Sequence, residues 1–224
     1  MKSVCVFGDS LAKGVVLDSI KNRYTFLKDS FLSLVSQKTG INFTNYSKFG
    51  CDIKKGRDIF LKHKEELCNY DFIFIEFGGN DCNFDWKSIS EHPDEVHQPQ
   101  TSLDEFENIY RGIVSDIMAL DAHPVLLSLP PLDADKFFNW VSKGNSPENI
   151  LKWLGDVDHI FRWHSSYNDV VCKLANELKV PLIDIRSTLL TKENYTDYIC
   201  DDGMHLNKKG HKLISNKVAQ FCTA

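Results

Sequence analysis

The sequence predicts an α/β protein: a single three-layer α/β/α domain over residues 1–224, built on a five-stranded parallel sheet. Short apolar runs alternate with stretches of helical periodicity, and this strand-then-helix unit occurs five times in series. The strand-like runs end at glycine, proline or polar clusters, as strands do where the chain leaves a sheet. No internal repeat or linker divides the chain, so the five units are expected to form one sheet with helices on both faces.

The strands are predicted from short apolar runs. The run from Val4 to Phe7 is continuously apolar, as in a strand buried on both faces, and stops at Gly8. The run before Gly78-Gly79 is rich in phenylalanine and isoleucine, which favour strands. The complete set is residues 4–7, 41–46, 70–77, 125–129 and 182–185.

The helices are predicted from apolar side chains spaced three and four residues apart. Residues 26–35 show this spacing ahead of a glycine stop. Ser102 and Glu105 form a capping-box pattern at the head of the clearest helix. Two more helices are expected at 157–178 and from Asn207 onward. Three long stretches are predicted to be irregular: residues 82–101, 132–156 and 186–201.

The composition excludes several classes of protein. A hydrophobic fraction of 42% and a charged fraction of 25% are typical of a globular protein with a core. A net charge of −5 spread over mixed signs gives no basis for binding nucleic acid or an anionic membrane. The N-terminal apolar run is too short for a signal peptide, and no run is long enough for a membrane anchor. The seven scattered cysteines lack the spacing of a zinc site, so we expect no metal and reduced thiols in a cytoplasmic protein. The oligomeric state stays open.

Four polar clusters follow predicted strands or precede the last helix. They are Gly8-Asp9-Ser10, residues 45–50, residues 78–81 and residues 202–205. With a flavodoxin-like strand order of 2-1-3-4-5, the first strand is central and ligands bind at the carboxyl ends of the strands. Each cluster alone is compatible with an ordinary turn or helix cap. Their order along one sheet edge favours a shared catalytic site.

These clusters contain the groups that ester hydrolysis requires. Ser10 is the candidate nucleophile, and His205 is the base that would take its proton. Asp202 would orient His205 and stabilise its charged form. The backbone N–H groups of Ser10 and Gly50 and the side-chain amide of Asn80 are the candidate oxyanion donors. We therefore expect activity to fall as His205 becomes protonated.

The clusters resemble the diagnostic blocks of the SGNH (GDSL-type) hydrolase superfamily. Residues 7–11 match its first block, residues 45–50 its second, and Gly78-Gly79-Asn80-Asp81 its G-x-N-D block, while Asp202 and His205 match its final D-x-x-H. The resemblance implies an esterase or acylhydrolase of the bacterial type that uses no metal or cofactor. It implies a small-molecule ester as substrate, including lipids and acylated sugars.

Two other functions stay open at this point. An acyltransferase of the same superfamily would pass the acyl group to another hydroxyl. A flavodoxin-like phosphate- or nucleotide-binding module would use residues 8–14 as a phosphate cradle, although Asp9 places a negative charge there.

Several other residues receive smaller roles. Asp9 is expected to hold its loop by hydrogen bonds to backbone, and His211 is expected on the surface. Asp133 and Asp184 follow strands without a partner that the sequence identifies. Aromatic residues gather in the three irregular stretches, and we expect Trp86 and Trp140 to bind substrate.

Overall fold

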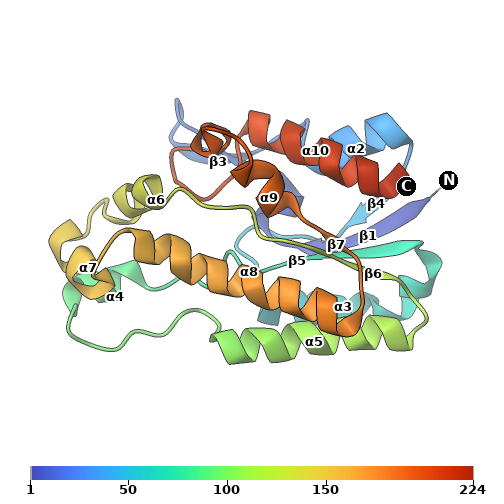
Figure 1. Ribbon diagram of the computed structural model, residues 1–224, viewed down its shortest axis with the longest axis horizontal. Helices are drawn as coiled ribbons and strands as arrows, with labels where there is room; N and C mark the ends of the chain where they lie inside the picture. Colours follow the sequence, from blue (N-terminus) through green and yellow to red (C-terminus); the bar gives the residue numbers. More distant parts are fainter. Residues whose placement is uncertain (1, 224) are drawn as a thin grey trace.

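A five-stranded parallel sheet forms the centre of the computed structural model, which describes residues 2–223 (Figure 1). The strand order is β4-β1-β5-β6-β7, which confirms the predicted order of 2-1-3-4-5 for the sheet strands. Val6 of the first strand pairs with Asn45 on one side and with Phe74 on the other, so this strand lies between the second and third sheet strands. The strands are β1 (Ser3–Gly8), β4 (Asn42–Asn45), β5 (Phe72–Glu76), β6 (Pro124–Leu127) and β7 (Leu182–Ile183).

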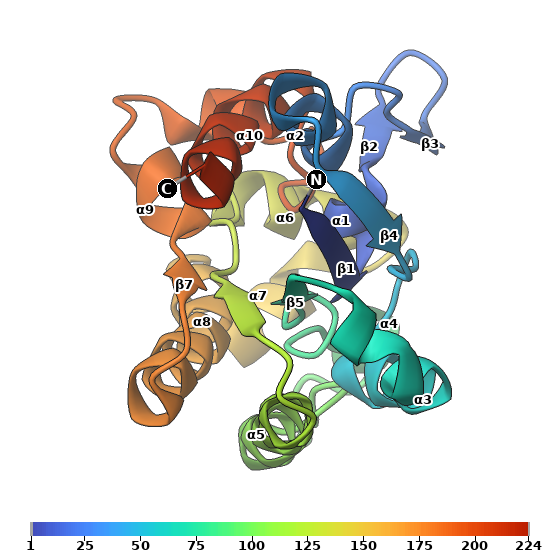
Figure 2. The ribbon, with the colours of Figure 1, turned by 90° about the vertical axis from the view of Figure 1, so that its right-hand side faces the viewer.

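Helices cover both faces of the sheet, as Figure 2 shows in the view along the strands. One face carries α2 (Phe31–Thr39) and α10 (Lys208–Thr223), which pack on Val4, Val6 and their neighbours. The other face carries α3 (Ile53–His63), α5 (Leu103–Ala119) and α8 (Asp158–Leu178), which pack on Cys5 and Phe7. Successive strand residues thus point to opposite cores, which explains why the strand was continuously apolar in sequence.

The stretch between β1 and α2 differs from the prediction. It holds a hairpin, β2 (Val15–Asp18) and β3 (Arg23–Phe26), after the short helix α1 (Ser10–Lys13). The helix predicted from Phe26 begins only at Phe31, because Ser30 caps it by accepting a hydrogen bond from the Ser33 N–H. Phe26 is two-thirds exposed, so its apparent helical spacing did not mark a buried face.

The stretches predicted to be irregular contain short helices, so that prediction was wrong. They are too short to show periodicity, but each of the four α-helices among them has a capping side chain at its start. Asp133 and Asp184, which lacked partners in the sequence, are two of these caps. The elements are α4 (Trp86–Glu91), α6 (Ala134–Val141), α7 (Pro147–Leu154), α9 (Ile185–Leu190) and the 3₁₀ turn η2 (Tyr195–Tyr198); a further 3₁₀ turn, η1 (Lys64–Asn69), follows α3.

Three of these short helices enlarge one end of the molecule. Helices α4, α6 and α7 lie beyond the carboxyl ends of the strands, at the left in Figure 1. They pack around a small apolar cluster of their own that includes Phe84, Phe137 and Ile150. This cluster forms one wall of the region where the four polar loops emerge.

His211 is fully buried in α10, which corrects the prediction that it lies on the surface. Its Nδ1 accepts a hydrogen bond from the Phe31 N–H at 3.3 Å and joins α10 to the start of α2. A single histidine in a polar stretch gives no periodic signal, so only the packing of two helices revealed its burial.

Candidate active site

Ser10 lies at the first turn after β1, the strand between β4 and β5. Asp9 caps α1 by accepting a hydrogen bond from the Leu11 N–H at 2.9 Å, which confirms its expected role in holding the loop. The Ser10 hydroxyl lies 3.5 Å from the nearer Asp9 carboxylate oxygen and is nine-tenths buried. Gly8 is needed before it, because a Cβ there would come within 2.9 Å of the Glu76 carboxylate.

His205 and Asp202 form a hydrogen-bonded pair on the loop before α10. The Nδ1–H of His205 donates to Asp202 Oδ2 at 2.7 Å. Asp202 Oδ1 accepts the backbone N–H groups of Met204 and His205, both at 3.0 Å. Burial opposes ionisation of Asp202, but these hydrogen bonds outweigh it and hold the pKa of its carboxyl below the usual range. The His205 Nε2 is buried and has no hydrogen-bond partner within residues 2–223.

The structure brings Ser10 and His205 into one small hollow, which we call the inner chamber. Its volume is about 30 Å³, counted for the centres of water-sized spheres, and Glu76, Gly79 and His164 also line it. A larger hollow of about 380 Å³, the outer cleft, lies beside it and is lined by Gly50, Asn80, Asp202 and His205 among others. His205 and Met204 border both hollows, so the two meet at the histidine.

The two candidate oxyanion loops differ in how free their donors are. Gly50 has φ of +68°, and its backbone N–H donates to no acceptor among residues 2–223. In contrast, the Asn80 amide donates to Asp9 Oδ2 at 2.9 Å and to the Cys51 carbonyl at 3.2 Å. Both amide hydrogens of Asn80 therefore have protein acceptors, and a substrate oxygen has to replace the more distant one.

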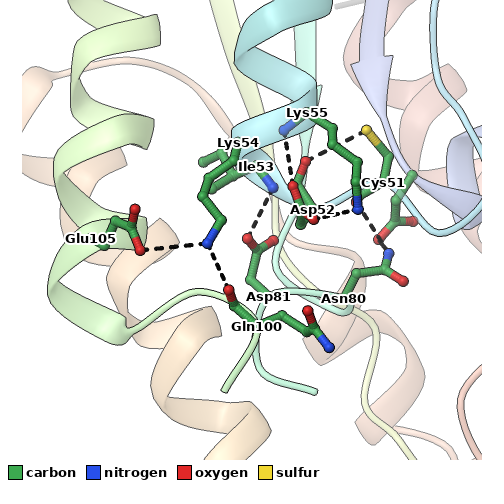
Figure 3. A network of polar contacts seen from close by, with 10 residues as sticks. Cys51, Asp52, Ile53, Lys54, Lys55, Asn80, Asp81, Gln100 and Glu105 are labelled. Carbon is green, nitrogen blue, oxygen red and sulfur yellow. Dashed lines mark hydrogen bonds and ion pairs between the residues drawn. The ribbon is translucent and has the colours of Figure 1, made fainter. Parts of the chain in front are cut away.

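A buried carboxyl joins these two loops (Figure 3). Asp81 Oδ1 accepts the Ile53 N–H at 2.9 Å, at the start of α3. Lys54 on the same turn reaches the Gln100 carbonyl at 2.7 Å. Burial raises the pKa of Asp81 to about 7, although the Ile53 N–H opposes this shift. The loop that carries Asn80 is thereby fixed to the helix that follows Gly50.

Glu76, which sequence reasoning missed, lies beneath the Ser10 loop. Its Oε2 accepts the Asp9 N–H at 3.2 Å and the Ala12 N–H at 3.4 Å. Burial, and then repulsion from the Asp9 carboxylate, raise the pKa of Glu76 well above its usual range. A charged residue closing an apolar strand was the signal in the sequence.

Aromatic side chains surround the outer cleft. Trp86 and Trp140, predicted to bind substrate, both line it. Tyr24, on the unexpected hairpin, lies with its ring centre 5.0 Å from that of His205, and Phe49 lies at 6.0 Å. Burial, and then the Asp202 carboxylate, raise the pKa of Tyr24, so its hydroxyl stays protonated.

The remaining ligand classes receive no geometric support from residues 2–223. No three histidine, cysteine, aspartate or glutamate side chains lie where they could hold a metal ion in this part of the chain. The Asp9 carboxylate itself occupies the N-terminus of α1, where a phosphate would have to bind. None of the helices described has the length and apolarity needed to span a bilayer.

Comparison with known proteins gives a family match over most of the chain. The model of the GDSL-like Lipase/Acylhydrolase family matches residues 6–213. The GDSL esterase/lipase CPRD49 of Arabidopsis thaliana is 24% identical over 157 residues, which are 69% of this chain and 55% of that protein. The chain spans about half the length of the curated relatives it matches.

Solved structures share the fold at low sequence identity. A lipase/acylhydrolase from Enterococcus faecalis superimposes with a TM-score of 0.69 at 16% identity, covering 99% of this chain and 95% of that one. A catalytic mutant of Axe2, an acetylxylan esterase from Geobacillus stearothermophilus, gives a TM-score of 0.65 at 17% identity, covering 98% and 93%.

Proposed function

This chain belongs to the GDSL-like lipase/acylhydrolase family, and from that premise we propose that it is a serine esterase that hydrolyses carboxylic esters through an acyl-enzyme. One observation supports this most directly. The His205 Nε2 is buried, has no hydrogen-bond partner among the described residues 2–223, and belongs to a residue that lines the same chamber as Ser10, while Nδ1 is hydrogen-bonded to Asp202. A hydrogen on Nδ1 leaves the lone pair of Nε2 available to accept a proton.

In the proposed reaction, the Ser10 hydroxyl oxygen attacks the acyl carbonyl carbon and its proton passes to His205 Nε2. Asp202 stabilises the imidazolium that forms. The carbonyl oxygen becomes an oxyanion that accepts hydrogen bonds from the N–H groups of Ser10 and Gly50 and from Asn80, displacing the Cys51 carbonyl. His205 then protonates the leaving alcohol, and a water molecule deprotonated by His205 releases the acid from Ser10.

The two hollows suggest which part of an ester each of them would bind. The inner chamber of about 30 Å³ suits a short acyl group, because a single water needs about 10–15 Å³ by this measure. The outer cleft of about 380 Å³ suits a larger alcohol. Trp86 and Trp140 offer ring faces and edges for a sugar there, with Asn83 and Asn145 as polar neighbours. We therefore propose a short-chain acyl ester of a bulky polar alcohol, such as an acylated sugar; the fold shared with an acetylxylan esterase is in keeping with this class.

We also propose a cytoplasmic location. The seven cysteines are unpaired in the structure, and five of them are buried. Free thiols persist where the compartment is reducing. Cell fractionation followed by detection of the protein with an antibody tests this location. Recovery of the protein outside the cytoplasmic fraction contradicts it.

Labelling with a fluorophosphonate probe tests the proposed chemistry. The probe should attach to Ser10, as found by mass mapping of the adduct, and Ser10→Ala should remove both labelling and activity on acetylated sugars and p-nitrophenyl esters. Labelling of another residue, or full activity in Ser10→Ala, contradicts the proposal. Ser47→Ala is a matched control, since Ser47 is buried nearby and lines neither hollow.

A further inference from the structure

Arg186 is a buried cation without a carboxylate partner. It lies in α9 with only 7% of its surface exposed. Within residues 2–223, no carboxylate oxygen lies within 4.0 Å of its guanidinium. Its Nη2 donates to Ser165 Oγ at 2.6 Å, and its plane lies over the Phe161 ring at 4.9 Å. Burying a charge without a counterion is strongly destabilising, so such a residue calls for an explanation beyond stability.

The guanidinium fixes the state of His164. Arg186 Nη1 lies 3.4 Å from His164 Nδ1 and also 3.4 Å from the Pro130 carbonyl. A guanidinium can only donate, so His164 Nδ1 must be the acceptor and carries no hydrogen. Burial, and then the adjacent positive charge, lower the pKa of His164 to about 3, so the ring is neutral. Its single hydrogen is therefore on Nε2, and Nε2 becomes a donor.

This donor lies where an acyl group would enter. His164 lines the inner chamber together with Ser10 and His205. It also lines a second, apolar hollow of about 20 Å³, to which Leu132 and Trp163 contribute. Gly79, His164 and Met204 line both hollows, so the two adjoin. Nε2 has no acceptor among residues 2–223, while Nδ1 faces the guanidinium. The Nε2–H of His164 is therefore available to donate a hydrogen bond to a group in these hollows.

We propose that the inner chamber and the adjoining apolar hollow form an acyl subsite in which His164 Nε2–H donates a hydrogen bond to an oxygen carried by the acyl chain. The subsite would thus favour short acyl groups with a hydroxyl or ether oxygen over plain alkanoyl groups of equal length. Arg186 is a positioning residue, since it holds the histidine as a donor on this edge. The inference rests on the proposed esterase function.

Two esters of matched size test the subsite. The p-nitrophenyl esters of methoxyacetic and butyric acid differ by an oxygen in place of a methylene, and share the leaving group. The measured quantity is the ratio of their kcat/KM values in the wild-type protein divided by the same ratio in His164→Phe. Intrinsic reactivity cancels in this quotient, so only the lost hydrogen bond remains.

We expect a quotient of about ten in favour of methoxyacetate, as one hydrogen bond is worth roughly that factor. A quotient within twofold of one overturns the subsite. His92→Phe is the matched control, because His92 is exposed and lines neither of these hollows, and it should leave the ratio unchanged.

Two further variants decide the matter if His164→Phe does not fold. His164→Gln retains a side-chain donor and should keep the preference, whereas Arg186→Met should reduce it by freeing the tautomer. An equal preference for the methoxyacetyl ester in His164→Gln and Arg186→Met overturns the inference. Ser10→Ala, assayed on the same two esters, separates the two proposals. If Ser10→Ala loses activity on both esters but the quotient for His164→Phe is close to one, the subsite alone is contradicted. If Ser10→Ala keeps full activity, the esterase mechanism is contradicted.

Discussion

The Asn80 side-chain amide donates to the Asp9 carboxylate at 2.9 Å, which joins the loops that follow β5 and β1. Its second amide hydrogen reaches the Cys51 carbonyl at 3.2 Å, on the loop that follows β4. One side chain thus connects the loops of three neighbouring strands. In the proposed mechanism this position is both structural and catalytic, because the amide must also meet the substrate oxyanion.

Replacing Asn80 by alanine should lower kcat by about 10²–10³ with a smaller effect on KM, since the lost donor acts on the transition state. Steady-state kinetics on one ester measures this, with circular dichroism to confirm folding. Asn145→Ala is the control, because Asn145 lines the same cleft but donates only to the Val141 carbonyl. Equal losses of kcat in the two variants would contradict the role of Asn80 as an oxyanion donor.

Asp202→Asn should reduce kcat by about 10⁴. The asparagine oxygen would keep the two backbone N–H groups now bound by Oδ1, which turns the NH₂ group toward His205 Nδ1. The histidine hydrogen would then move to Nε2, where Ser10 cannot transfer its proton. Asp201→Asn, an exposed neighbour, should retain full activity. An active Asp202→Asn enzyme argues against the assigned pair.

Asp81→Asn should stabilise the protein at pH 8 but not at pH 4. The folded pKa of Asp81 is raised from 3.8 to about 7, so the folded state binds the proton more tightly and loses stability as pH rises between these values. Asparagine keeps the acceptor for the Ile53 N–H without the buried charge. Urea unfolding at both pH values measures this. Asp81→Ala, which leaves that N–H unpaired, should instead be destabilised at both.

His211 should make the protein less stable as pH falls from about 6.5 to about 4. Burial, and then the nearby His205, lower the pKa of His211 from 6.5 to about 4, so the unfolded chain binds more protons in this window. His164 acts in the same direction. His211→Asn should flatten the pH dependence of unfolding, while His92→Asn, on the surface, should not. An unchanged slope in His211→Asn would contradict its burial in the neutral form.

Gly50→Ala and Gly203→Ala should fail in different ways. Both glycines have positive φ, at +68° and +74°. A Cβ on Gly50 meets nothing within 4 Å, so Gly50→Ala should fold with a strain of about 1–2 kcal/mol and lose activity by crowding the cleft. A Cβ on Gly203 would lie 2.2 Å from the Phe137 nitrogen, so Gly203→Ala should lower the melting temperature sharply. Melting curves and kinetics together distinguish the two outcomes.

The sequence was sufficient for features that depend on local pattern. Continuous apolar runs fixed the strands to within two residues or so, because a strand buried on both faces has no polar alternation to obscure it. Strand order follows from the general preference of such sheets, and it predicts that Ser10 lies between Gly50 and Asn80. The short helices escaped prediction, since six to eight residues are too few to show a period.

Local pattern in the sequence by itself determined the strands and the polar groups at their carboxyl ends, since these follow from residue spacing along single chain segments. The order of the strands followed from the general preference of such sheets. Tertiary structure alone decided which of those groups are buried together. It placed the ring of Tyr24 beside that of His205, put a buried Glu76 beneath the Ser10 loop, and set Arg186 against His164 across twenty-two positions of sequence. Such contacts depend on how separate elements pack and on how far each charged group is desolvated. Neither the packing nor the desolvation can be predicted from local sequence pattern.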